Sequence, residues 1–327
     1  MPYFLLPLLF SLGWPGSVQG PQEYIELLKQ AQAANQSRYP SGELRFLSSK
    51  RQVGQLSFFD RSRVHLVWQH DKVWAEVERW LHHTHDVDMK STPPTERVEY
   101  IVNGLNCVEY YPALQRAFVT AAVRGSLPEK LWASPAARWY SPWTLASAGL
   151  TWGKILSPTS LPGTDPAAVH YKVTDQAGSI VRVLRHEDKY GGDVDMSFSL
   201  PLDGNVVDYE IREPVSSYTG KGSCDWEKDS RGRLYLARST YSEGRRLPGE
   251  SISNVYKYEM LHFDPDFKPP ARRFDMASLS FPEGVVVENQ ITGRRQRVGD
   301  RPVDSVEGRI KALIEIMRSR GFALGGN

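Results

Sequence analysis

The chain has 327 residues, of which 40% are hydrophobic and 24% charged, with a formal net charge of only +2. This balance is ordinary for a globular protein and gives no general attraction for polyanions, so nucleic acid is not an expected partner. The length suits one large domain, because β-sheet proteins of roughly 200–250 residues or more commonly form a single unit.

An apolar run, Leu5–Leu12, lies near the N-terminus and is followed by small and turn residues from Gly13 to Gly20. This order is typical of a secretory signal peptide. The run is too short to cross a bilayer, which takes about 20 apolar residues. Residues 1–20 are therefore predicted to be a leader that sends the protein to the periplasm or cell envelope. The alternatives are a retained anchor or a poorly ordered tail.

A helical pattern follows the leader. Tyr24, Leu27, Leu28 and Ala31 recur at helical spacing, and Pro21 suits the first turn of a helix. The turn residues 39–42 end this segment, and from residue 43 the hydrophobic period changes to two.

The first predicted group of strands shows the alternation of half-buried β-structure. Val64, Leu66 and Trp68 recur at every second position, which places these three side chains on one buried face. The polar residues of the alternation are Arg63, His65 and Gln69. Residues 97–102 alternate in the same way and end at Asn103-Gly104, the residue types that a tight hairpin turn favours. The returning strand, with Val108 and Tyr110, completes a predicted hairpin.

The segment 128–160 differs from its surroundings because it is rich in tryptophan and proline. Its tryptophans are Trp132, Trp139, Trp143 and Trp152. Pro142 limits any helix in this segment to a short piece. So many large apolar rings in a short span either fill a core or cap a cavity.

Strands resume after Pro166. The cleanest alternation is in residues 193–200, and Asp203-Gly204 predicts the hairpin turn that follows it. Repeated short strands joined by turns indicate an antiparallel meander. The stretch Ser305–Arg318 has the pattern of an amphipathic helix.

Motifs for catalysis are weak throughout. The sequence has no nucleophile elbow, no zincin helix and no dinucleotide fingerprint, and 149–155 departs from a phosphate loop. The run His82–Asp88 has good metal-ligand types, but on a strand its side chains divide between two faces, and an exposed polar loop is the simpler interpretation. Cys107 and Cys224 are either a disulfide in an oxidising compartment or two buried small residues. We predict no catalytic residue, no metal and no cofactor.

The strongest functional indication is the aromatic content, 11% of the chain. Many aromatic residues sit at alternating strand positions, where they either fill a core or line an apolar cavity. The predicted cavity-lining residues are Val64, Leu66, Trp68, Tyr110, Trp139 and Trp143. The segment between Trp139 and Trp143 is predicted to act as a movable lid.

The order of leader, helix, meander, aromatic insertion and second meander resembles the LolA-like family of periplasmic lipoprotein-sorting and lipid-binding proteins. The segments that carry the resemblance are Arg97–Gly104 running on to Val108–Pro112, and Leu279–Val287 followed by Gly293 and Arg297–Gly299. The second group resembles a variant of the family found in planctomycete genomes. The resemblance covers residues 21–300.

This resemblance implies an α+β, mainly β fold, in which a large curved antiparallel sheet forms an unclosed half-barrel with an N-terminal helix and a helical, Trp-rich lid. It implies a non-catalytic carrier of an acyl lipid or a lipoprotein in the cell envelope, with peripheral membrane contact as a further option. The predicted domains are the leader 1–20, the half-barrel 21–300, and a C-terminal helix and tail 301–327. The alternatives are an envelope scaffold with a filled sheet core and, after it, an enzyme without a readable motif.

Overall fold

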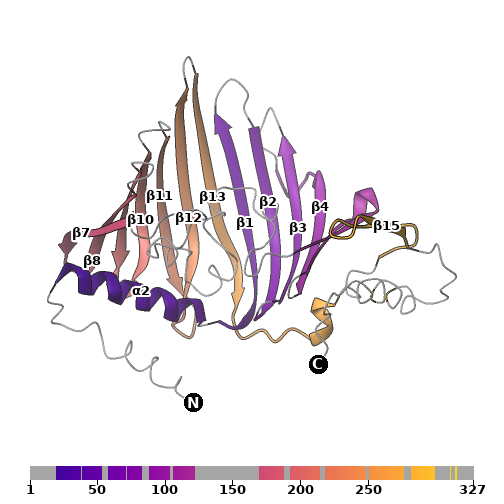
Figure 1. Ribbon diagram of the computed structural model, residues 1–327, viewed down its shortest axis with the longest axis horizontal. Helices are drawn as coiled ribbons and strands as arrows, with labels where there is room; N and C mark the ends of the chain where they lie inside the picture. The colour runs from indigo at the N-terminus through magenta and orange to yellow at the C-terminus, as the bar shows by residue number, and fades with distance from the viewer. Residues whose placement is uncertain are drawn as a thin grey trace.

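The protein folds around one very large β-sheet. The computed structural model describes residues 20–37, 39–53, 58–70, 72–82, 88–103, 106–121, 169–187, 192–213, 218–247, 250–275 and 281–298, with 310 and 314. Within these ranges fifteen strands form a single sheet in the order β15-β14-β6-β5-β4-β3-β2-β1-β13-β12-β11-β10-β9-β8-β7. Figure 1 shows it as one curved layer with β7 and β15 at its two ends.

The strands fall into two meanders and a short C-terminal hairpin. The first meander comprises β1 (Ser41–Val53), β2 (Phe58–Gln69), β3 (Lys72–His82), β4 (Glu96–Asn103), β5 (Asn106–Tyr111) and β6 (Arg116–Ala121). The second comprises β7 (Val169–Ala177), β8 (Ile180–Glu187), β9 (Gly192–Ser199), β10 (Asn205–Glu213), β11 (Tyr218–Lys228), β12 (Leu234–Leu247) and β13 (Glu250–Asp264). The hairpin is β14 (Val286–Asn289) and β15 (Arg294–Arg297).

The two meanders meet where the first strand of the chain pairs with the last strand of the second meander. Leu44 on β1 lies opposite Leu66 on β2 and opposite Phe263 on β13. All neighbouring strands pair antiparallel except β14, which runs parallel to β6. The predicted open, mainly antiparallel sheet is confirmed, since β7 and β15 are its two edges.

One α-helix, α2 (Pro21–Ser37), packs on the face that we call the inner face. Figure 1 shows it lying across one end of the strands of the second meander. Tyr24, Ile25 and Leu28 are buried against apolar side chains of β8–β13. Tyr24, Leu28 and Ala31 of the predicted set are buried, whereas Leu27 is only partly buried and Ile25 takes its place. The predicted start at Pro21 is confirmed.

The opposite face, which we call the outer face, is covered at the β3–β6 end by the chain that follows β13. The short helix η5 (Ala271–Phe274) packs on it, together with Phe281 and Val285, which precede β14. Phe274 and Val285 are fully buried there, and the Asn103 side-chain amide donates to the carbonyl of Phe274 at 3.3 Å. The outer face of the first meander is therefore covered near β4 and β5.

The hairpin turns agree with the sequence patterns. β4 and β5 pair as predicted, with Asn103 opposite Asn106. After the short helix η4 (Leu200–Leu202), Asp203 and Gly204 adopt φ values of 54° and 68°, so the predicted turn is confirmed. Of the predicted C-terminal helix only Ile310 and Ile314 are described, and both are helical. Residues 1–19 of the predicted leader 1–20 and the Trp-rich segment 128–160 lie outside the described residues.

Candidate ligand-binding face

Three of the predicted cavity-lining residues come together on the inner face. The side chains of Val64, Leu66 and Trp68 project from the same side of β2, and each is at most 1% exposed. Tyr110 is not brought to this face. It packs against Phe281 on the outer face, with ring centroids 5.1 Å apart. Trp139 and Trp143 lie outside the described residues.

The position of Tyr110 follows from the alternation of β5. Cys107 and Tyr111 belong to the inner cluster around Trp68, while Val108 and Tyr110 belong to the outer cluster around Phe274. Because successive residues of a strand point to opposite faces, Tyr110 cannot line the same space as Leu66. Alternation alone could not decide between the two faces, since Val108 and Tyr110 alternate with a set that is also mostly apolar or aromatic and whose one charged member is the buried Glu109.

The inner face carries an apolar surface that continues through both meanders. One row runs across paired strands through Leu44, Leu66, Ala75 and Tyr100. A second cluster on β8–β13 includes Met196, Phe198, Leu236 and Tyr256. Trp226 and Tyr258 pack against both clusters and make the surface continuous. Among the described side chains of α2, those that belong to a cluster pack on the second meander and none packs on the first.

Glycines allow large aromatic rings to lie along the inner face instead of standing away from it. A Cβ atom at Gly42 would overlap the indole of Trp68, and Cβ atoms at Gly222 and Gly220 would overlap the rings of Tyr209 and Tyr241. Tyr209 and Tyr241 are stacked with ring centroids 5.7 Å apart. The spacing Gly220-x-Gly222 within a strand is a sequence signal for such close approach.

The end of the inner face near the start of β1 is closed by Tyr39 and its neighbours. The indole nitrogen of Trp68 donates to the carbonyl of Tyr39 at 3.0 Å, and the Tyr39 hydroxyl donates to the carbonyl of Leu234 at 3.2 Å. Tyr39 also packs edge-on against Phe263. We call this end of the inner face, formed by Tyr39, Trp68 and Phe263, the floor. Trp68 is fixed there, because both its ring and its N–H have partners.

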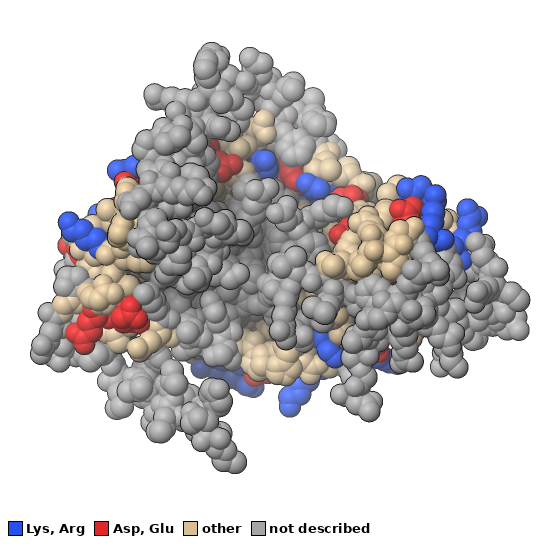
Figure 2. Space-filling model, in the orientation of Figure 1, with Lys and Arg blue, Asp and Glu red and all other residues tan. Residues whose placement is uncertain are grey.

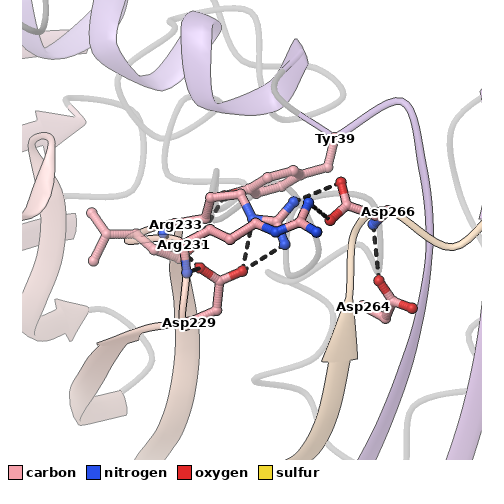
Figure 3. Close-up of polar contacts among 7 residues, drawn as sticks. Tyr39, Asp229, Arg231, Arg233, Asp264 and Asp266 are labelled. Atoms are coloured by element: carbon pink, nitrogen blue, oxygen red, sulfur yellow. Dashed lines mark hydrogen bonds and ion pairs between the residues drawn. The ribbon is translucent and has the colours of Figure 1, made fainter.

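Charged residues link the β11–β12 turn to the end of β13 beside this floor (Figure 3). Arg233 lies between Asp229, at 2.7 Å, and Asp266, at 2.8 Å. Arg231 pairs with Asp266 at 2.5 Å. The hydrogen bond from Arg233, with the charge of Arg231 beside it, holds the pKa of the Asp266 carboxyl below its usual value. This network holds together the two strand ends that meet at Tyr39.

Polar groups occupy the other end of the inner face, away from the Tyr39 floor. Asp60 is 1% exposed and accepts two hydrogen bonds from Arg79, at 3.0 and 2.5 Å. Glu96 lies 3.7 Å from the same guanidinium. The hydrogen bond to Asp60 is the main cause that raises the pKa of Arg79. The inner face of the first meander therefore changes from apolar at the floor to charged at the far end.

A second buried carboxylate, Glu109, lies among the apolar residues of the inner face. It sits opposite Tyr100 in the β4–β5 register and accepts a 2.9 Å hydrogen bond from the Tyr111 hydroxyl. Burial, and then the nearby Glu109 charge, raise the pKa of the Cys107 thiol to about 12. Cys107 and Cys224 lie in different clusters, and no disulfide joins them.

A further compact group of titratable side chains lies on the outer face. His65 Nε2 is 2.7 Å from a carboxylate oxygen of Glu43, and its ring meets Trp74 edge-on. The guanidinium of Arg273, from η5, lies 3.8 Å from the centre of the Trp74 ring. Burial is the main cause that lowers the pKa of His65. This group ties η5 to the sheet.

The described part of the chain offers no assembled metal site. No group of three or more His, Cys, Asp or Glu residues within it is placed to hold a metal ion. Most of the His82–Asp88 run lies outside the described residues. Asp88 itself caps a turn, accepting hydrogen bonds from the Lys90 amide at 3.0 Å and the Ser91 hydroxyl at 2.9 Å. Among the described helices, none is long and apolar enough to cross a membrane.

Comparison with known proteins gives only distant similarity. No family model matches the chain, and no curated protein sequence matches it. Among solved structures, a LolA superfamily protein from Nitrosomonas europaea aligns with a TM-score of 0.35 and 10% identity, covering 78% of this chain and 97% of that one. Lipovitellin aligns with a TM-score of 0.25 and 9% identity over 73% of this chain and 29% of that one.

A porin-like protein from Bacteroides uniformis aligns with a TM-score of 0.23 and 8% identity, covering 66% of this chain and 96% of that one. Scores this low carry no argument about fold or function. Membership of the LolA-like family stays a prediction from the sequence patterns.

Proposed function

We propose that the inner face binds the acyl chain of a lipid or of a lipidated protein in the cell envelope, and that the protein works without catalysis. The observation that carries this proposal is the continuous apolar inner face of a single open sheet. A sheet with one apolar face needs a second layer to cover it. Among the described residues, α2 supplies such a layer only over the second meander.

The chemistry of the inner face suits an amphiphile. Residues near the Tyr39 floor are apolar, and burying a methylene group contributes about 0.8 kcal/mol, so a long acyl chain gains substantially. The far end holds the charged side chains of Asp60, Arg79 and Glu96, which suit the polar end of the same molecule. The acyl chain would then point towards Trp68.

Two buried alanines provide a matched test of this proposal. Ala75 lies on the inner face beside Leu66, and Ala117 lies on the outer face beside Val287; both are 0% exposed. We expect Ala75→Leu to weaken saturable binding of a fluorescent fatty acid or acylated peptide, because the added methyl groups occupy the face. Ala117→Leu should leave the affinity unchanged. The melting temperatures of the two variants show whether they lose similar stability.

The rival function is an envelope scaffold whose inner face is a filled core. The near-complete burial of Val64, Leu66 and Trp68 is the observation that favours it. Native mass spectrometry of protein purified from its own host separates the two. A retained acyl ligand supports the carrier, whereas ligand-free protein without saturable fatty-acid binding leaves the scaffold as the better explanation.

A further inference from the structure

Three exposed arginines lie at the β15 end of the sheet. Arg116 begins β6, and Arg295 and Arg297 lie on the edge strand β15. The register places Val286 of β14 opposite both Arg116 and Arg297, and Glu288 opposite both Phe118 and Arg295. Paired residues project to the same side of a sheet, so all three arginines share the side of Phe118, which packs on the inner face.

An exposed aliphatic side chain accompanies these charges. Leu114, in the short helix η1 (Pro112–Leu114), is 63% exposed and lies two residues before Arg116. Ile291, in the β14–β15 turn, is 45% exposed. Figure 2 shows basic side chains gathered at the end of the molecule where Figure 1 places β15. We call Leu114, Arg116, Arg295 and Arg297 the arginine edge.

Acidic residues only partly balance this edge. Arg295 lies 3.4 Å from Glu288, whose side chain is 30% exposed. Glu283 is exposed just before β14. Arg116 and Arg297 add two further exposed cations, so three arginines face two glutamates and the edge keeps a net positive charge.

Protection of the sheet edge explains only part of this pattern. Charged residues on an edge strand prevent pairing with other chains, and that accounts for Arg295 and Arg297. It does not account for Arg116, which lies on the third strand from the edge, or for the exposed Leu114. Exposed basic residues beside aliphatic ones are the combination that binds the surface of an anionic bilayer.

We infer that the arginine edge docks the protein on the surface of an anionic lipid bilayer. Lipid phosphates meet the three guanidinium groups, and Leu114 enters the boundary between headgroups and acyl chains. The arginines project to the side of the inner face, so docking brings one end of that face next to the bilayer. The docking itself does not require the inner face to hold a ligand.

The test is binding of the full chain to vesicles in a sedimentation assay. Neutral phosphatidylcholine vesicles are compared with vesicles that contain about 30% phosphatidylglycerol, between about 50 and 200 mM salt. We expect binding only to the anionic vesicles, and weaker binding as salt rises. The triple variant Arg116→Gln, Arg295→Gln and Arg297→Gln should bind about 100-fold more weakly, since each arginine near an anionic surface contributes about 5-fold.

A matched control removes the same charge elsewhere. Arg63→Gln, Arg212→Gln and Arg238→Gln change side chains that are 45%, 60% and 59% exposed and lie on β2, β10 and β12. The affinity of this control for anionic vesicles should fall by less than about 5-fold. Leu114→Ser should weaken binding without changing its dependence on salt. Equal losses in the two triple variants, or equal binding of the wild type to neutral and anionic vesicles, would overturn the inference. Circular dichroism confirms that each variant is folded.

Discussion

Replacing Gly42 with alanine tests how the floor of the inner face is built. Gly42 lies on β1 opposite Trp68 of β2. A Cβ atom at this position would overlap Cη2 and Cζ2 of the indole and would lie 2.9 Å from the carbonyl oxygen of Asp264. Trp68 is fully buried and has no free space into which it can turn without losing contacts.

The expected change in stability combines two destabilising effects and one that offsets them. Forcing an extra atom into a packed site costs about 1–3 kcal/mol, and losing the hydrogen bond from the indole to the Tyr39 carbonyl costs about 1–3 kcal/mol more. Alanine restricts the unfolded chain, which offsets about 0.4–1 kcal/mol. We therefore expect Gly42→Ala to destabilise the protein by about 3 kcal/mol.

The assay is urea unfolding, followed by tryptophan fluorescence and by circular dichroism. The cause is isolated by repeating the substitution in a Trp68→Leu background, where the overlap with the indole is absent. The cost of Gly42→Ala should fall there by at least about 1 kcal/mol, because residues in contact do not act additively. The Asp264 carbonyl still crowds the new methyl group, so a smaller cost remains. An undiminished cost in the Trp68→Leu background would refute the reasoning.

Two further predictions concern titratable groups. Cys107 should resist thiol reagents in the folded protein and react only after denaturation, because burial raises the pKa of its thiol to about 12; labelling native protein at pH 8 within minutes would contradict this. Burial lowers the pKa of His65, so the folded state binds fewer protons than the unfolded state, and stability should decrease as the pH falls from about 7 through the lowered pKa. His65→Gln should flatten the dependence of the urea midpoint on pH between about pH 7.5 and 5.5. This window lies above the pKa of Glu43, which is also lowered. An unchanged pH dependence would show that another group is responsible.

Local sequence patterns predicted most of the elements of this fold. The spacing of Tyr24 and Leu28 identified α2, and the alternation of Val64, Leu66 and Trp68 identified both β2 and its inner face. These patterns suffice because each element has one face that is covered and one that is more polar. The turn at Asp203 was predictable for a different reason, since few residue types accept positive φ.

Long-range features were not predictable in the same way. The pairing of β1 with β13 joins segments about 200 residues apart, and no local period records it. The chain after β13 covers the outer face of β4 and β5, so apolar residues occur on both sides of these strands. Alternation then identifies a strand without telling which side is inner, and this is why Tyr110 was assigned to the wrong neighbours.

The pairing of β1 with β13 also bears on what the inner face can do. It places the floor residue Trp68 and the stacked tyrosines Tyr209 and Tyr241 on one continuous surface. Each of these rings lies over a glycine on a neighbouring strand. The rings therefore lie close to the sheet, and the layer of side chains is thinner than it would be if the rings pointed away from the sheet. Close contact between a ring and a glycine of the neighbouring strand stabilises an antiparallel sheet whether its face is a filled core or a binding surface. For the proposed carrier, the same rings would give an acyl chain a smooth apolar surface, so the ligand-binding experiments decide which of the two uses this face has.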